Sequence, residues 1–318
     1  PLPPGLHRGL TAVTVLGYLS FLSSTALFLF IGFRLFQWRR GSGKAQPLNQ
    51  FVLLIFNLLL ADLQQSVAFL LNTQWLIDDS ITVGTATCWA QGWFVSTGDL
   101  ASGVWCSAIG LHTFASVLFN YRMRPAMFYC TIISLWVFIY GCAVIGVGMH
   151  PTDFYVRAGA WCWIDGKFSG ARLWLHYFWI FVAEFGTIVV YVSLYIGLIS
   201  RLRSNYYTPL AAKHAKQAAR LMALYPAVYI MCTLPLASAR MMSIAGSPPS
   251  YERLCVAGAM ITSNGWLDVL VYTLTRRISL FSNEPPPDAL GVETFTVPFF
   301  GGSQTGRFGT VTTIEGPP

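Results

Sequence analysis

Seven long apolar stretches run through the sequence, and they constrain its fold more than any other feature. A helix needs roughly 20 mostly apolar residues to cross a membrane. Only 10% of the residues are charged, whereas a soluble domain has about 25%. We therefore predict an all-α integral membrane protein folded as a seven-transmembrane helix bundle. The predicted spans are Leu10–Phe36, Leu48–Trp75, Cys88–Asn120, Met127–Met149, Leu173–Ser200, Leu221–Ala245 and Arg253–Leu274.

The distribution of Lys and Arg predicts the orientation of this bundle. Most of these residues fall in the connections on one side of the predicted membrane, which also holds the C-terminus. Because basic loops stay in the cytoplasm, we expect an outside N-terminus and a cytoplasmic C-terminus in the plasma membrane. The basic residues are scattered over short loops beside the membrane. Lipid is therefore an expected partner, and nucleic acid is not.

Around the bundle we expect two short flanking regions. Residues 1–9 are predicted to be a short extracellular tail and 10–281 the seven-transmembrane domain. Residues 282–318, rich in Gly, Thr, Ser and Pro, are predicted to be a disordered cytoplasmic tail. Just before it, Arg276 and Arg277 precede Ile278, Leu280 and Phe281, a pattern that favours a short amphipathic helix on the membrane.

Acidic residues lie within the predicted spans. Asp99 is near the middle of the third stretch, and Glu184 lies at a similar depth in the fifth. An ionisable group at that depth costs about 2.5–3.5 kcal/mol against lipid, so both carboxyl groups should face protein or water. Arg240 is close enough to the end of the sixth stretch either to reach the membrane interface or to contact a ligand.

Three of the seven cysteines lie on the predicted outer side, where thiols can be oxidised. Cys88 begins the third stretch and Cys162 lies in the longest outer loop. We predict a disulfide between these two, with Cys255 as the competing partner.

Several segments resemble the G-protein-coupled receptors, and most closely the fungal cAMP-receptor-like and glucose-receptor-like branch. The segments are NLLLAD at 57–62, HTF at 112–114, LYPAVYIMCTLPLASARM at 224–241 and NGWLDVLVYTLTRR at 264–277. The resemblance implies a receptor that senses an extracellular ligand, such as a nutrient, a sugar or a cAMP-like molecule. It also implies activation of a heterotrimeric G protein through its Gα subunit, feeding cAMP or kinase signalling.

Comparison with the larger rhodopsin-like branch gives roles to single positions. Asp62, Ser102 and Asp268 fall where that branch has interior polar residues, and the comparison implies an interior polar cluster. His112-Thr113-Phe114 stands in place of that branch's Asp-Arg-Tyr switch, so its arginine lock has no counterpart here.

For a receptor, polarity and depth select a pocket among the third, fifth, sixth and seventh spans beneath the outer loop. The predicted ligand-binding residues are Trp93, Asp99, Trp163, Tyr177, Glu184, Tyr229 and Asn264. Basic residues at the cytoplasmic ends are predicted to face the G protein; they are Arg122, Arg124, Lys213, Lys216, Arg220, Arg276 and Arg277.

The alternative function is a proton-coupled transporter that uses the buried carboxylates Asp62, Asp99, Glu184 and Asp268. An enzyme is not expected, because the sequence contains no HExxH, no GxSxG and no metal-spaced Cys/His cluster. We accordingly predict neither a catalytic residue nor a cofactor.

Overall fold

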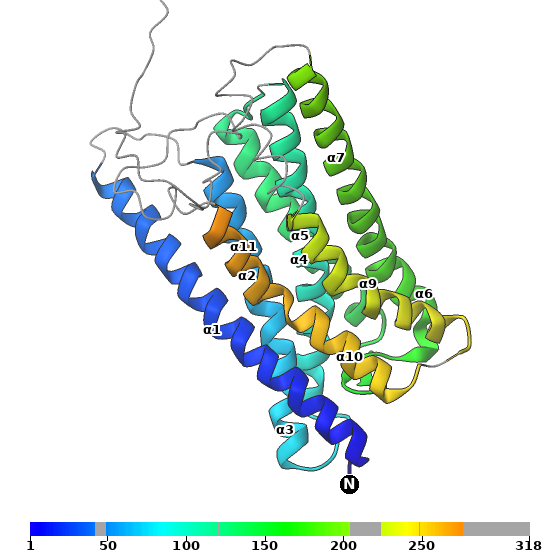
Figure 1. Ribbon diagram of the computed structural model, residues 1–318. Helices are drawn as coiled ribbons and strands as arrows, with labels where there is room; N and C mark the ends of the chain where they lie inside the picture. The colour runs from blue at the N-terminus through cyan, green and yellow to red at the C-terminus, as the bar shows by residue number, and fades with distance from the viewer. Residues whose placement is uncertain (42–48, 120, 204–223, 248, 276–318) are drawn as a thin grey trace, which may run out of the picture.

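The computed structural model describes residues 1–41, 49–119, 121–203, 224–247 and 249–275 (Figure 1). Within these residues, seven helical segments are long and apolar enough to cross a membrane, as the sequence predicts. The predicted amphipathic helix and the predicted tail lie outside the described residues. The helices are α1 (Pro4–Gly41), α2 (Gln50–Leu70), α3 (Asn72–Ile77), α4 (Ala86–Phe119), α5 (Pro125–Met149), α6 (Ser169–Arg172), α7 (Phe178–Arg203), α9 (Leu224–Ile244), α10 (Tyr251–Thr262) and α11 (Asn264–Thr275).

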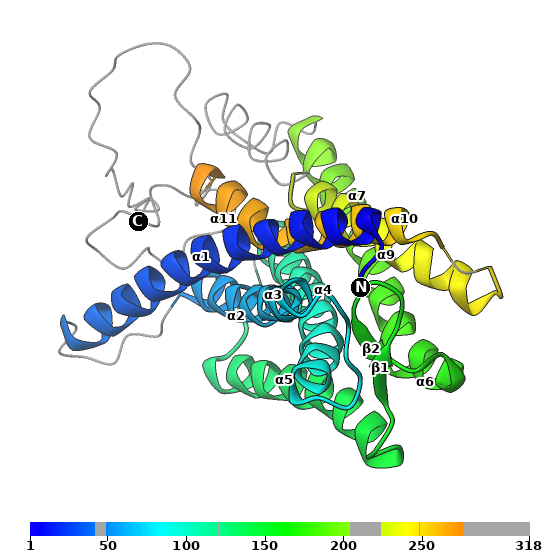
Figure 2. The same ribbon diagram turned by 90° about the horizontal axis from the view of Figure 1, so that it is seen from below.

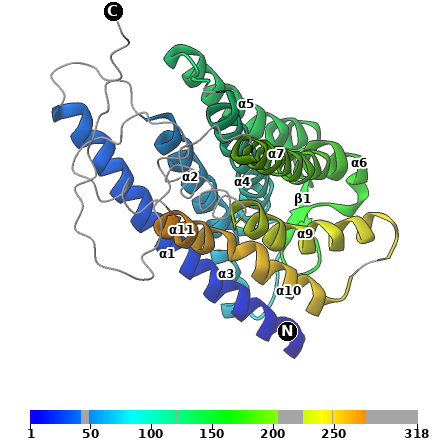
Figure 3. The ribbon, with the colours of Figure 1, turned by 45° about the horizontal axis from the view of Figure 1, so that its top comes forward.

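Helix α4 occupies the middle of the bundle. It packs against α2, α5, α7 and α9. Helix α1 lies along α2, α10 and α11, and Figure 3 shows α4, α5 and α7 grouped on the other side. A change in the packing of any of these four helices therefore alters a contact of α4.

Close contact between the helices depends on glycines of α4. A Cβ atom at Gly98 would lie 2.6 Å from the backbone nitrogen of Gln65 in α2. One at Gly103 would lie 2.4 Å from the hydroxyl of Tyr229 in α9. Small residues allow this approach, and van der Waals packing of this kind holds membrane helices together.

Polar caps and a break set the helix boundaries that matter for the site. The side-chain oxygen of Asn49 accepts hydrogen bonds from the backbone N–H groups of Phe51 (3.0 Å) and Val52 (3.2 Å), which starts α2. The seventh span consists of α10 and α11, separated at Ser263. Asn264 therefore begins α11 inside the bundle, where irregular backbone is tolerated only when protein surrounds it.

A short antiparallel hairpin closes one end of the bundle. It consists of β1 (Tyr155–Arg157) and β2 (Cys162–Ile164), which pair Val156 with Trp163. We call residues 155–164 the hairpin, its side of the bundle the hairpin end, and the other side the opposite end. Figure 2 looks onto the hairpin end and shows the strands lying between α4 and α6.

The predicted disulfide is confirmed at this end. Cys88 near the start of α4 is bonded to Cys162 in β2. Cys255, the competing partner, is a buried free thiol. The bond ties the central helix directly to the hairpin, so the two cannot separate without reduction.

Candidate functional site

The hairpin places two tryptophans inside the bundle. Trp161 and Trp163 are both almost completely buried. Trp161 packs edge-on against Phe69 of α2, with ring centroids 5.4 Å apart. Tyr155 is buried beside Trp89, and burial raises the pKa of its phenol to about 12. The hairpin thus closes this end of the bundle with buried aromatic side chains, and we call these side chains the aromatic plug.

A π-helical segment at the start of the fifth span packs against this plug. The segment Leu173–Tyr177 turns His176 and Tyr177 inward, with ring centroids 5.3 and 5.2 Å from Trp163. Short π segments are common at functional sites because they redirect side chains. The arrangement brings together Trp163 and Tyr177, two of the predicted ligand-binding residues.

Two buried arginines complete the hairpin end. The guanidinium carbon of Arg172 lies 5.0 Å from the centre of the Trp163 ring, and that of Arg240 lies 5.3 Å from the rings of both Trp161 and Trp163. Arg240 donates to the carbonyl of Ala158 at 2.6 Å. It is only 4% exposed, so it neither reaches the membrane interface nor lies in solvent.

Asp99 lies beneath the plug on α4. Its Oδ1 accepts a hydrogen bond from Gln65 Nε2 at 3.0 Å. Arg240 of α9 and Tyr177 of the π-helical segment are neighbours of Asp99. A buried carboxyl group, a buried guanidinium and a phenol therefore share one region.

Glu184 lies at the boundary between α7 and α9, and within the part of the chain that the structure describes neither of its carboxyl oxygens has a hydrogen-bond partner. It is 2% exposed. The nearby Thr233 hydroxyl donates to the carbonyl of Tyr229 at 2.8 Å, so its proton is already used within α9. The hydroxyl of Tyr229 is also buried without a partner.

The predicted interior cluster comes together around Asn264. Its Nδ2 lies 2.9 Å from Ser102 Oγ, 3.1 Å from Asp268 Oδ2 and 3.4 Å from Asp62 Oδ1. Ser102 also donates to Asp62 Oδ1 at 3.3 Å. One amide thus connects polar residues of α2, α4 and α11. Although depth assigned Asn264 to the ligand pocket, its contacts are in this cluster.

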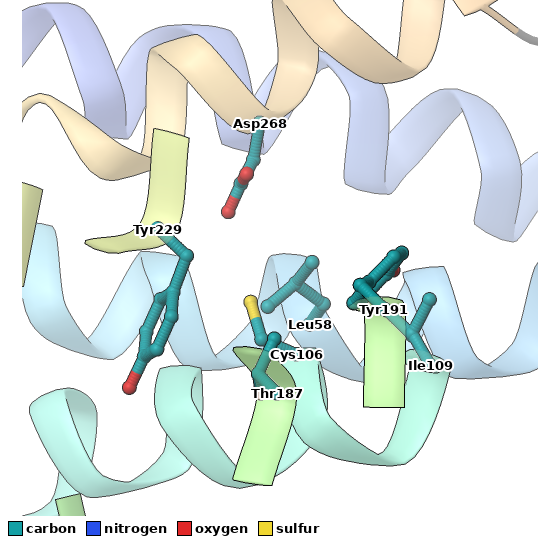
Figure 4. Close-up of a pocket in the computed structure, with 7 residues that line it drawn as sticks. All are labelled: Leu58, Cys106, Ile109, Thr187, Tyr191, Tyr229 and Asp268. Atoms are coloured by element: carbon teal, nitrogen blue, oxygen red, sulfur yellow. The ribbon is translucent and has the colours of Figure 1, made fainter. Parts of the chain in front are cut away.

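A pocket lies beside the cluster (Figure 4). The pocket is small, and Asp268 points into it from α11. The other lining residues come from α2, α4, α7 and α9; they are Leu58, Cys106, Ile109, Thr187, Tyr191 and Tyr229. Tyr229 therefore lies between this pocket and the region of Glu184.

Trp93 is not brought together with the other predicted ligand-binding residues. Its ring stacks between Trp89 of α4 and Tyr140 of α5, with centroids 5.5 and 6.3 Å away. Asp99 follows Trp93 by six residues, which is about 240° around a helix, so the two side chains point to different sides of α4. Because the spacing is visible in the sequence, the period of the helix alone could have separated Trp93 from Asp99.

The opposite end has its own polar contacts. His112 shares a hydrogen bond of 3.2 Å with Gln50, which donates in turn to the carbonyl of Met123 at 2.7 Å. Arg201 of α7 donates to the carbonyl of Val117 at 3.1 Å and also to that of Leu118. A cation at the last carbonyls of a helix is favourable, so Arg201 caps α4.

Of the residues predicted to face a G protein, Arg122 and Arg124 are exposed between α4 and α5. Lys213, Lys216, Arg220, Arg276 and Arg277 lie outside the described residues. The sequence analysis missed three contributors to the site: Arg172, His176 and Gln65. Only the polarity of these residues within apolar spans could have indicated them.

Comparisons with known proteins agree with the resemblance drawn from the sequence. Residues 211–278, which include α9, α10 and α11, match the family described as "G protein-coupled glucose receptor regulating Gpa2 C-term". No curated protein sequence matches significantly. Among solved structures, the chain is similar to squid rhodopsin with a TM-score of 0.61 at 13% identity, covering 88% of this chain and 87% of rhodopsin.

The rhodopsin likeness confirms the seven-span fold, and the family match confirms the receptor class predicted from the motifs at 224–241 and 264–277. The chain therefore has the seven-helix fold of rhodopsin, and over residues 211–278 it matches the family of G protein-coupled glucose receptors that regulate Gpa2.

Proposed function

We propose that the protein is a plasma-membrane receptor that binds a sugar-like nutrient outside the cell and activates a Gα subunit inside. The observation that carries this proposal is the match of residues 211–278 to a receptor family whose name specifies glucose and Gpa2. The seven-span bundle provides the two faces that such a receptor requires.

The hairpin end is proposed to face outside. A disulfide between Cys88 and Cys162 requires an oxidising compartment, which supports this orientation. Arg122 and Arg124 lie at the opposite end, where the positive-inside rule places them in the cytoplasm. The proposed Gα contact surface contains these two arginines, with the predicted residues in 213–220 and 276–277.

The ligand is proposed to bind beneath the hairpin. Trp163 and Tyr177 supply aromatic surfaces, and Asp99 supplies a carboxylate deeper in the bundle. Sugar rings are well suited to such a site, because their C–H faces pack on aromatic rings while their hydroxyls hydrogen-bond to buried polar groups. Glu184 and Tyr229 form the proposed floor, since both carry buried polar atoms without partners.

Nucleotide exchange tests this function. The receptor in nanodiscs is mixed with purified Gα subunits, including Gpa2, and guanine-nucleotide exchange is followed with and without glucose and other sugars. We expect a sugar to accelerate exchange on one Gα. Failure of every Gα from the receptor's own cell to respond, with ligand or without, would overturn the proposal.

Variants then locate the two faces. Changing both Arg122 and Arg124 to Glu should weaken Gα activation and leave sugar binding intact. Arg253 is an exposed arginine at the start of α10, at the hairpin end, so Arg253→Glu is the matched control. A control variant as defective as the double variant would contradict the proposed orientation.

The transporter alternative receives less support. Proton transfer along Asp62, Asp99, Glu184 and Asp268 requires the carboxyl groups to be linked. Asn264 links Asp62 to Asp268, but the hydrogen bond to Asp99 comes from Gln65, and Glu184 has no hydrogen bond. Sugar-dependent proton uptake into liposomes, abolished by Asp268→Asn, would favour the transporter.

A further inference from the structure

The two buried arginines at the hairpin end make the same kinds of contact from different helices. Arg172 belongs to α6, and its Nε and Nη2 both donate to the carbonyl of Ile164 in the hairpin. Arg240 belongs to α9, and its Nη1 donates to the carbonyl of Ala158, at the start of the hairpin turn. Both guanidinium groups lie over Trp163. They differ in which helix they attach to the hairpin.

The attachment through Arg240 lies beyond a proline. Pro235 lies within α9, five positions before Arg240. Proline removes one hydrogen bond from a helix and is the commonest cause of a kink, so it marks a place where the two parts of α9 can change their angle. Arg240 thus attaches the segment from Pro235 to Ile244 to the hairpin through a buried hydrogen bond and two ring contacts.

One part of this guanidinium is unused. Nη2 of Arg240 is buried and has no hydrogen-bond partner among the described residues. A guanidinium that left the Ala158 carbonyl would lose its remaining hydrogen bond, and an unpaired buried charge is very costly. The contact with Ala158 therefore favours the arrangement in which α9 is attached to the hairpin.

We propose that Arg240 is the positioning residue that transmits displacement of the hairpin to α9. In the resting arrangement it binds the carbonyl of Ala158 and the faces of Trp161 and Trp163. A ligand that displaces the hairpin breaks this contact, and α9 is then released to change its angle at Pro235. This inference rests on the proposed receptor function.

The two arginines give a matched experiment. In Arg240→Gln the hairpin loses its attachment to α9, so nucleotide exchange without ligand should rise by about five-fold or more, the lower end of typical allosteric coupling. Arg172→Gln removes a similar stack and similar hydrogen bonds from α6. It should raise exchange without ligand by less than Arg240→Gln does, because α9 stays attached to the hairpin. Equal increases in both variants would overturn the proposal, since loosening of the hairpin in general would then be sufficient.

Hydrogen exchange monitored by mass spectrometry tests the link without any G protein. We expect Arg240→Gln to speed exchange in residues 236–244 of α9, and Arg172→Gln to speed it in the hairpin only. Unchanged exchange in α9 of Arg240→Gln would refute the link. Because this readout needs no Gα, a receptor that activates none would overturn the proposed function and leave the mechanical link to be decided here.

Discussion

The two sides of α7 differ in how well their polar groups are satisfied. Toward α4, Ser107 shares a hydrogen bond of 3.0 Å with Thr187 and is 3.3 Å from the carbonyl of Ala183, and Arg201 caps the end of α4. Toward α9, the carboxyl group of Glu184 has no hydrogen-bond partner among the described residues. One boundary has hydrogen bonds between the helices at two places, and the other contains a buried polar group left unpaired.

The difference indicates which helix moves. A buried polar group without a partner is rare in native proteins and marks a place where the observed arrangement is not the best available one. At the α4–α7 boundary, Ser107 and Arg201 instead make hydrogen bonds from one helix to the other. We therefore expect α4 and α7 to stay together and α9 to move against them, which agrees with the position of Arg240 at the hairpin end of α9.

The largest effect on stability is expected from adding a side-chain atom at the close contact between α4 and α2. In Gly98→Ala the new Cβ would lie 2.6 Å from a backbone nitrogen of α2, which has no freedom to move aside. We expect a loss of about 3 kcal/mol in stability, from overpacking. Thermal unfolding in detergent measures it.

Gly141→Ala in α5 is the control, because no atom lies within 4 Å of the Cβ position. Alanine there should be neutral or raise stability by up to about 1 kcal/mol, through helix propensity. Equal losses in the two variants would show that the α2–α4 contact has no special importance.

A smaller loss is expected from the α4–α7 boundary itself. Ser107→Ala removes the hydrogen bond to Thr187 and should cost about 1 kcal/mol in the same unfolding measurement. The hydroxyl of Ser23 donates to Leu19 of its own helix at 2.8 Å, so Ser23→Ala is the control and should cost less. If both changes are silent, the boundary is held by packing alone.

Replacing Glu184, unlike replacing Ser107, should not lower the stability of the protein. Methionine has a similar length and needs no hydrogen bond, so Glu184→Met should leave the resting protein as stable as before or raise its stability by up to about 1 kcal/mol. The same unfolding measurement compares it with Ser107→Ala. A loss above about 1 kcal/mol would mean that the carboxyl group is well paired, and the contrast between the two boundaries would disappear.

The smallest effect belongs to the exposed ion pair beside the hairpin. A hydrogen bond from Lys167 lowers the pKa of Asp153, so its small contribution to stability is present above the ordinary Asp pKa of about 4. It is lost as the pH falls through the lowered value. At pH 7, Asp153→Asn should cause no measurable change in unfolding temperature, as is usual for exposed pairs.

Much of the fold could be predicted because each membrane span can be recognised from the length and apolar composition of its own segment. Apolar length gave the seven spans, and the position of Cys88 and Cys162 on one side gave their disulfide. The spacing of motifs also led to Asp62, Ser102 and Asp268, which the structure connects through Asn264.

The remainder depends on contacts between distant segments. Arg240 near a helix end suggested an interfacial anchor as readily as an interior residue, because nothing local reveals that the hairpin folds over it. Asn264 was assigned by depth, and the break at Ser263 that points it at Asp62 has no strong signal. The assignment of Trp93 to the ligand pocket is a different case. Its six-residue spacing from Asp99 shows that the two side chains lie on different sides of the helix, but the prediction used depth alone.

The disulfide also determines which way the hairpin faces. Each strand has only three residues, and so short a pairing specifies its register weakly. A slip by one residue would turn Trp163 out of the bundle. With Cys162 bonded to Cys88, that slip is excluded. The order of events during synthesis is therefore significant: with the hairpin end outside, as proposed, oxidation of one thiol pair in the secretory pathway selects the form in which Trp163 is buried in the bundle.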